Sequence, residues 1–144
     1  MILRIFIIII ITFYSKIVLT KEIPIIVISA GKSPQSKSIV GSDIYSIDEN
    51  QISESNEFFV GDIINQSVPG MSMFQSGGYG TVTGIQMRGL PGRYSTIYID
   101  GVKMSDPSTP DNRYYGINQI PAETVEKIEV LKGTHGSLYG SNAI

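Results

Sequence analysis

The sequence predicts an α+β domain in which a small β-sheet is combined with short helices and long loops. Three segments alternate apolar and polar residues and then run into a glycine, which predicts strands at 85–88, 97–100 and 127–132. Their charged residues are expected on one face of the sheet. Fifteen glycines and seven prolines, concentrated after Val68, predict many turns and irregular connections.

The composition excludes several kinds of protein. Thirteen acidic residues against eleven basic ones give a net charge of −2, so no basic surface for nucleic acid is predicted. The absence of cysteine excludes a disulfide framework and a thiolate metal site. At 144 residues the chain is one domain at most, with short appendages. Much of its apolar content lies in the first thirty residues, so the remaining core is thin for a free-standing domain.

Residues 1–20 have the composition of a signal peptide. Arg4 provides the positive start, and Ile5–Tyr14 is an apolar run of the length expected for the hydrophobic region of such a peptide. A membrane-spanning helix needs about 20 apolar residues, and Lys16 interrupts the run earlier. We therefore expect export. An uncleaved membrane anchor that extends through Leu19 is the alternative.

Residues 21–40 are expected to carry an extended segment on a flexible linker. The segment 25–30 is mostly β-branched, which favours an extended backbone. The polar stretch 31–38 favours flexibility. Such a strand can add to the open sheet edge of another protein, or it can be an ordinary first strand of the domain. The residues alone leave both readings open.

Residues 41–144 are expected to form the folded domain. A strand is predicted at Ile44–Ile47, and a helix is predicted from a cap at Ser55 or Asn56 to about Ser67.

The second half of that domain is predicted to be richer in turns. Met71–Phe74 alternates and predicts a further strand, Asp100-Gly101 predicts a tight turn, and Pro121–Val125 suits a short helix. Three polar loops lie between these elements: Gln75–Gly80, Leu90–Tyr94 and Asp106–Tyr115.

The sequence shows no pattern typical of a catalytic or metal site. His135 is the single histidine and has no paired carboxylate at ligand spacing. Asp106, Asp111 and Asn112 are too irregular for a calcium-binding loop. There is no arrangement typical of a nucleophilic triad. We expect no catalysis, no metal and no cofactor. A secreted hydrolase that uses Asp100 or Asp106 would need a second carboxylate at a defined distance, and the sequence provides none.

Several short motifs follow one another in a recognisable order. They include Gln86-Met87-Arg88-Gly89, Ile97-Tyr98-Ile99-Asp100-Gly101-Val102, Val125-Glu126-Lys127-Ile128-Glu129-Val130-Leu131-Lys132-Gly133 and Leu138-Tyr139-Gly140-Ser141-Asn142-Ala143-Ile144. This order resembles the plug domain of TonB-dependent outer-membrane receptors, above all the cobalamin (vitamin B12) branch, over Ile25–Ile144. It implies a small mixed sheet with short helices, lodged in the wide lumen of a 22-stranded β-barrel.

The segment after Pro24 looks like the TonB box of these receptors, the mobile strand to which the energy-coupling protein TonB binds. Its residues are Ile25, Ile26, Val27, Ile28, Ser29 and Ala30. The resemblance thereby favours strand addition, with TonB and its inner-membrane energising complex as partners. It implies an outer-membrane location with this strand facing the periplasm. A free periplasmic interaction module that uses the same strand and has no barrel is the alternative.

Arg88 and Lys132 stand where plug domains place basic residues against glutamates of the barrel wall. Neither partner is expected within this chain, and a charge stripped of its partner in the lumen would cost several kcal/mol. A solvated position is the alternative for Arg88. Lys132 departs from the more usual arginine and loses the planar bidentate fork, and Thr134 departs from the usual proline.

The resemblance also implies a large small-molecule ligand, a corrinoid or an iron–siderophore chelate, touched by loops at the outward tip. Aromatic and amide groups in the three polar loops suit such a ligand. Simple packing of the loops is the alternative role for the tyrosines. The candidate contacts are Gln75, Tyr79, Arg93, Tyr94, Asn112, Tyr114 and Tyr115.

The length of the chain is short for a complete receptor. A membrane-spanning strand takes about 9–11 residues, so 22 strands need a few hundred residues more. The ending at Ile144 resembles the beginning of another strand. We therefore expect a receptor fragment or truncated product without its barrel, unable to transport alone and only loosely folded.

Overall fold

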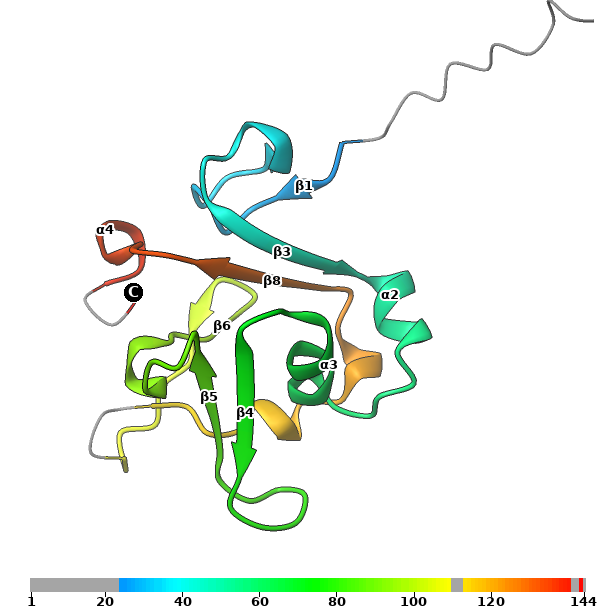
Figure 1. The fold of residues 1–144 in the computed structure, drawn as a ribbon, viewed down its shortest axis with the longest axis vertical. Coiled ribbons are helices and arrows are strands. Elements are labelled where there is room, and N and C mark those ends of the chain that lie inside the picture. Colours follow the sequence, from blue (N-terminus) through cyan, green and yellow to red (C-terminus); the bar gives the residue numbers. More distant parts are fainter. Residues whose placement is uncertain (1–23, 110–112, 141–142, 144) are drawn as a thin grey trace, which may run out of the picture.

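Short strands and short helices are arranged around one core in the computed structural model, which describes residues 24–109, 113–140 and 143 (Figure 1). The predicted signal peptide lies outside these residues. The strands are β1 (Ile26–Val27), β2 (Gln35–Ser36), β3 (Asp43–Asp48), β4 (Met71–Gln75), β5 (Thr83–Met87), β6 (Tyr98–Ile99), β7 (Val102–Lys103) and β8 (Lys127–Lys132). The α-helices are α2 (Glu49–Glu54), α3 (Val60–Ser67) and α4 (Gly136–Tyr139). The 3-10 turns are η1 (Lys37–Ile39), η2 (Gly92–Tyr94), η3 (Ile117–Gln119) and η4 (Ala122–Thr124).

The α+β class is confirmed, and the strands pair in a simpler way than one mixed sheet. Within the described part of the chain they form four two-stranded antiparallel pairs: β1–β2, β3–β8, β4–β5 and β6–β7.

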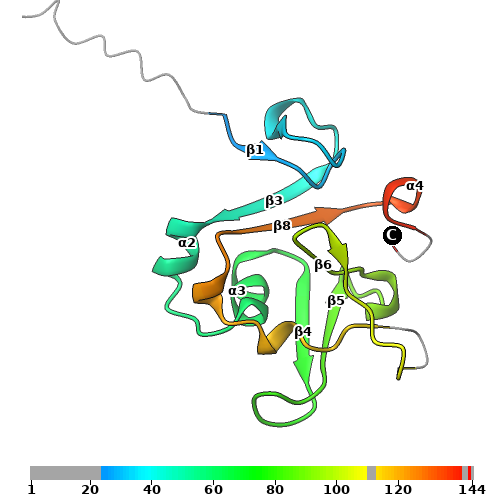
Figure 2. The same cartoon turned by 180° about the vertical axis from the view of Figure 1, so that it is seen from behind.

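β3 and β8 form the longest pair and cross the middle of the domain (Figures 1 and 2). Tyr45 stands opposite Val130 and Ile47 opposite Ile128, so these side chains share one face. Both predicted strands are confirmed. Lys132, two residues after Val130, lies on the same face, and its side chain is buried. The prediction that the charged residues share the polar face is therefore wrong for Lys132.

The core lies between this face and α3. Ile63 is completely buried, and Val60, Ile64 and Val68 are buried beside it, as expected for apolar residues at helical spacing. The buried cluster consists of Ile47, Ile52, Val60, Ile63, Ile64, Val68, Ile117, Ala122, Ile128 and Val130.

The helix predicted from Ser55 or Asn56 to Ser67 begins later in the structure, where α3 covers Val60–Ser67, and an additional helix that was not predicted, α2, precedes it. The helix α2 begins at a capping box in which Asp48 accepts from the N–H of Gln51 at 2.9 Å and the Gln51 side chain binds back to Asp48. The chain then turns at Asn56, whose φ of 57° is left-handed. An asparagine tolerates that conformation, so Asn56 separates the helices instead of capping one.

The predicted tight turn at Asp100-Gly101 is confirmed. Both residues have positive φ, 49° and 80°, and they connect β6 to β7. Two positive φ values are the signature of the type I′ hairpin turn that Asp-Gly favours. The predicted helix at 121–125 is the short 3-10 turn η4, which follows Pro121.

The first strand and the β4–β5 connection lie at opposite ends of the domain (Figures 1 and 2). Over the described residues, none of the helices has the length and hydropathy that crossing a bilayer requires.

Candidate functional site

The segment Ile25–Ala30 is docked against the domain as a paired strand. Val27 stands opposite Gln35 of β2, and the carbonyl of Ile25 accepts a hydrogen bond from the N–H of Lys37 at 2.8 Å. The exposed fraction of Val27 is 0%. The prediction that this segment has no partner within the chain is therefore wrong for this structure. The structure shows the alternative, in which the segment is a strand of the domain. Binding to TonB stays a prediction.

Side chains of β8 bind the same segment from its other side. The Glu129 carboxylate accepts hydrogen bonds from the N–H of Ile28 at 3.0 and 3.1 Å and from the N–H of Ser29 at 2.7 Å. Lys127 donates to the carbonyl of Ile26 and forms an ion pair with Glu129 at 2.7 Å. These contacts join parts of the chain about a hundred residues apart.

Tyr139 of α4 adds a third contact. Its hydroxyl donates to the carbonyl of Ser29, and its ring meets that of Tyr98 edge to face at 5.1 Å. Burial raises the pKa of Tyr139, and Tyr98 and Glu129 add to that effect, so the hydroxyl remains a donor. The three side chains that hold the segment, Lys127, Glu129 and Tyr139, are called the clamp below.

The β2 strand and the clamp together occupy both edges of the segment. Backbone groups of successive residues in a strand point to alternate edges. Ile25 and Val27 face β2, whereas Ile26 and Ile28 face Lys127 and Glu129. Strand addition requires a row of unpaired backbone groups. The docked segment therefore has a partner strand on one edge, and on its other edge the Ile26 carbonyl and the Ile28 N–H are already bonded.

Glu129 is ionised in the docked state. Burial is the largest single effect and raises the pKa of this carboxyl, but Lys127 and the donors of Ser29 and Ile28 together outweigh it and lower the pKa below 4.5. An ionised acceptor makes stronger hydrogen bonds than a neutral one. The clamp is thus an electrostatic contact as well as a geometric one.

Arg88 has a partner within the chain, contrary to the expectation from the sequence. It lies just after β5 with a left-handed φ of 52°, and its N–H donates to the carbonyl of Gly70 at 2.6 Å. Its guanidinium forms an ion pair with Asp43 at 2.9 Å, and both side chains are about half exposed. Further pairing of Arg88 with a barrel carboxylate remains a prediction.

Lys132 is also satisfied within the chain. Its exposed fraction is 4%, its ammonium donates to the carbonyl of Pro69, and it lies 3.9 Å from the centroid of the Tyr45 ring. Burial lowers the pKa of Lys132, the Asp43 charge opposes this, and Arg88 adds to it.

We expect the stability difference between the wild type and Lys132→Met to depend on pH, because Lys132 is a buried cation. The wild-type lysine is charged in the folded and unfolded states at neutral pH, so the folded state carries the whole desolvation cost there. As pH rises through the lowered folded-state pKa towards 10.5, that cost is relieved. The unfolding free energy of the wild type, measured against the variant in urea, should therefore increase with pH in the alkaline range. A difference that decreases would contradict the assignment.

The predicted ligand contacts are divided between two places. Gln75 and Tyr79 lie at the β4–β5 end of the domain. The Gln75 amide donates to the carbonyl of Gly78 at 2.5 Å and accepts from Asn118 at 3.1 Å. Tyr79 has an exposed fraction of 72%, and its ring centroid lies 5.2 Å from that of Phe59.

The other candidates gather around the loop after β5. Arg93 and Tyr114 line one pocket. Tyr94 lies next to them, with its ring 5.1 Å from the Arg93 guanidinium, and Tyr115 lies 5.0 Å from the guanidinium of Arg113. Asn112 lies outside the described residues.

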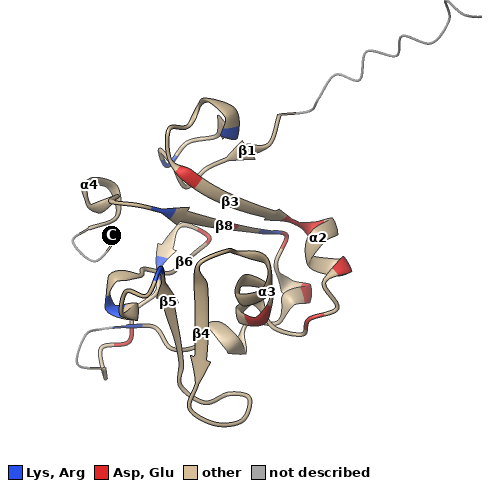
Figure 3. Ribbon diagram, viewed as in Figure 1, with Lys and Arg blue, Asp and Glu red and all other residues tan. Residues whose placement is uncertain are grey.

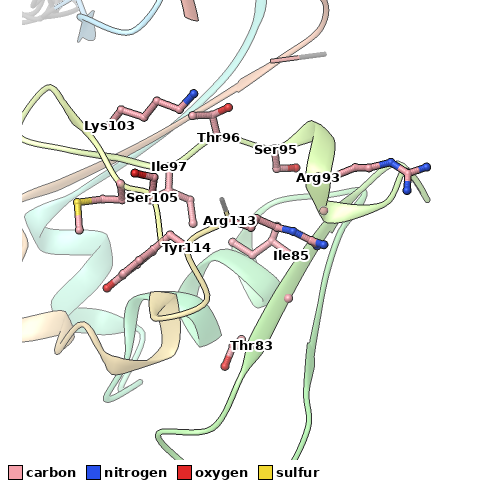
Figure 4. A pocket seen from close by; sticks show the side chains of 13 residues that line it. Thr83, Ile85, Arg93, Ser95, Thr96, Ile97, Lys103, Ser105, Arg113 and Tyr114 are labelled. Carbon is pink, nitrogen blue, oxygen red and sulfur yellow. The ribbon is translucent and has the colours of Figure 1, made fainter. Parts of the chain in front are cut away.

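This pocket has a volume of about 460 Å³ and lies between β5, η2 and the β6–β7 hairpin (Figure 4). Its lining residues are Thr83, Gly84, Ile85, Gly92, Arg93, Ser95, Thr96, Ile97, Lys103, Met104, Ser105, Arg113 and Tyr114. Several of them, Lys103 and Arg113 above all, were not predicted as contacts. The Asp100-Gly101 turn could have indicated Lys103, because a tight hairpin returns the chain alongside the strand that precedes it.

The described residues contain no group of three or more His, Cys, Asp or Glu side chains that could hold a metal ion.

Comparison with known proteins gives relatives that include three vitamin B12 transporters. The Vitamin B12 transporter BtuB of Vibrio vulnificus strain YJ016 is 31% identical over 119 residues, which are 83% of this chain and 19% of that protein. The protein of the same name from strain CMCP6 is 30% identical over 119 residues, and that of Photobacterium profundum is 28% identical over 120. The chain thus spans about a fifth of the length of these relatives.

The family description TonB-dependent Receptor Plug Domain matches residues 36–144, most of the chain. The motif order, the small antiparallel pairs and the short helices agree with that match. The chain belongs to the family of TonB-dependent receptor plug domains.

Proposed function

We propose that this chain is the gate of an energy-coupled outer-membrane receptor that imports a large, scarce ligand, with Ile25–Ala30 as the strand to which TonB binds. The family match and the relatives named vitamin B12 transporters support this proposal and favour a corrinoid over an iron chelate. The observation that carries it is the docked segment, a strand whose two edges are both occupied by contacts within the chain.

The mechanism follows from the position of this strand. A partner strand can pair with Ile25–Ala30 only after β2 or the clamp has released an edge. The ligand-contact loops include the β4–β5 connection at the opposite end of the domain (Figure 1). Ligand binding at that end shifts the equilibrium towards the released strand only if the ligand has a higher affinity for that state. TonB then pairs with the strand and, energised by the inner membrane, pulls the gate open.

Arg88 is the better placed of the two predicted contacts with the barrel. Its guanidinium has five donors, it is about half exposed, and its bond to Asp43 uses one of its nitrogens. A second carboxylate from the barrel wall can therefore bind beside Asp43. Lys132 is buried, so a barrel carboxylate reaches it only if the surrounding side chains move.

The substitution Val27→Pro tests the coupling strand. Proline removes the backbone N–H and cannot take part in a strand pair. In cells carrying the receptor that contains this chain, we expect Val27→Pro to abolish uptake while ligand binding to the cells is retained. Val27→Ala is the control, because it shortens the side chain but keeps the N–H, and it should retain most of the uptake.

Equal loss of binding and uptake in Val27→Pro would indicate damage to the whole domain and would count against the coupling role. Equal loss of uptake in both variants would show that the buried side chain matters and the backbone pairing does not.

A free periplasmic interaction module that binds its partner by strand addition is the second candidate. It is favoured by the partners that Arg88 and Lys132 find within the chain, Asp43 for the first and Pro69 with Tyr45 for the second. Reading the DNA downstream of Ile144 separates the two candidates. A succession of alternating segments of about ten residues supports the receptor, and a genuine stop codon supports the module.

A further inference from the structure

The side chains that line the pocket beside η2 are basic, whereas the chain as a whole has a negative net charge. Three of its thirteen lining residues are cationic, Arg93, Lys103 and Arg113, and none of the thirteen is acidic. The chain carries a net charge of −2. Many of its acidic residues lie around α2 and the turns near it, away from the β5–β6 connection (Figure 3). The lining itself is therefore basic, and Asp106 adjoins it next to Ser105.

Arg113 is the cation that crosses this pocket (Figure 4). Its guanidinium passes over the backbone of Gly92, where an added Cβ atom would lie 2.7 Å from Arg113 Nη1 and 2.5 Å from the carbonyl oxygen of Ile85. The guanidinium also lies 5.0 Å from the ring of Tyr115. The missing side chain at Gly92 thus leaves room for the guanidinium at this point.

Neutral donors complete the lining. Ser95, Thr96 and Ser105 contribute hydroxyl groups around the same volume, and Lys103 lies beside Thr96 (Figure 4). Guanidinium and ammonium groups together with hydroxyls are the set of donors that binds phosphate and carboxylate oxygens in proteins.

We propose that this pocket binds an anionic oxygen group of the transported ligand, a phosphate diester or a carboxylate, with Arg113 across the pocket and Lys103 beside it. The assignment to the transported ligand rests on the proposed function. Binding of the anion itself does not. The pocket of about 460 Å³ is too small for a whole corrinoid or iron chelate and large enough for one such group.

The test uses the full 144-residue chain in detergent micelles, titrated with three small probes and observed through backbone amide shifts. Dimethyl phosphate and acetate carry one negative charge, whereas trimethyl phosphate is neutral. We expect saturable shifts at Gly92 and Thr96 with at least one of the two anions and none with trimethyl phosphate. The anion that binds more tightly identifies the group, phosphate diester or carboxylate.

Lys103→Met and Lys37→Met are compared because each removes the charge of one lysine and only Lys103 lines the pocket. We expect Lys103→Met to weaken anion binding about two- to fivefold and Lys37→Met to leave it unchanged. Absence of saturable shifts with both anions, equal shifts with the neutral probe, or equal effects of the two variants would overturn the proposal.

The result is separable from that of the Val27→Pro experiment. If the anions bind but Val27→Pro does not change uptake, the anion site is supported and its assigned role in transport is not. Uncoupling by Val27→Pro without anion binding would remove this inference alone.

Discussion

Ile63→Ala is expected to lower the free energy of unfolding by about 2–5 kcal/mol, the range measured for such truncations in well-packed cores. Ile63 has an exposed fraction of 0% and lies on α3, between that helix and the face of β3 and β8 that carries Ile47 and Val130. Removing three carbon atoms there loses their transfer free energy and leaves a cavity. The measurement is urea unfolding of the 144-residue chain followed by circular dichroism.

Ile39→Ala is the matched control. The same atoms are removed, but Ile39 has an exposed fraction of 75%, and surface substitutions usually change stability by within about 0.5 kcal/mol. Equal, small effects of the two substitutions would mean that the chain has no fixed core by itself. That outcome would agree with the loose fold expected from the sequence and contradict the packing described above.

Local patterns were enough to predict most of the secondary structure. The strands at 44–47 and 127–132 followed from alternation, and the turn at Asp100-Gly101 followed from its two residue types. These features depend on neighbours within a few residues, so they are legible without the fold. The helix boundary was missed at Asn56, although Asp48 and Gln51 formed a legible capping box.

The docking of the N-terminal segment could not be predicted in the same way. Its partners, Glu129 and Tyr139, lie about a hundred residues further along the chain. The residues alone left a free strand and a strand of the domain equally open, and only the resemblance to plug domains favoured the free strand. Lys132 is different, because its spacing from Val130 already placed it on the buried face of β8.

The ligand-contact loops were predicted as segments and not as a site. The structure brings Arg93 and Tyr114 to one pocket, leaves Gln75 and Tyr79 at the β4–β5 end, and adds Lys103 from a hairpin. Polar loop composition indicates which segments face solvent. Which of them meet depends on how the antiparallel pairs pack, and that is set by core contacts distant in sequence.

Glu129→Gln is expected to open the docked segment. The substitution keeps the shape of the side chain and removes the charge that accepts from Ile28 and Ser29 and pairs with Lys127. Charge-assisted hydrogen bonds are roughly twice as strong as neutral ones, and each contributes about 1.5–3 kcal/mol. Amide hydrogen exchange at Ile28 and Ser29 should therefore become about tenfold faster or more.

Glu126→Gln is the matched control, because Glu126 is exposed and lies three residues before Glu129. It should leave exchange at Ile28 and Ser29 unchanged, and an equal effect of both variants would argue that net charge, not the clamp, holds the strand.

The dependence on pH gives a second, independent reading of the same contact. Because docking lowers the pKa of Glu129 below 4.5, its contribution is complete above that value. It is lost as pH falls through the docked-state pKa. Protonated glutamate and glutamine have the same shape and charge, so the exchange rates of the wild type should approach those of Glu129→Gln as pH falls from about 5. If the two proteins stay as different in acid as at neutral pH, the carboxylate is not what closes this edge of the strand, and the release proposed for TonB binding must be controlled from the β2 side.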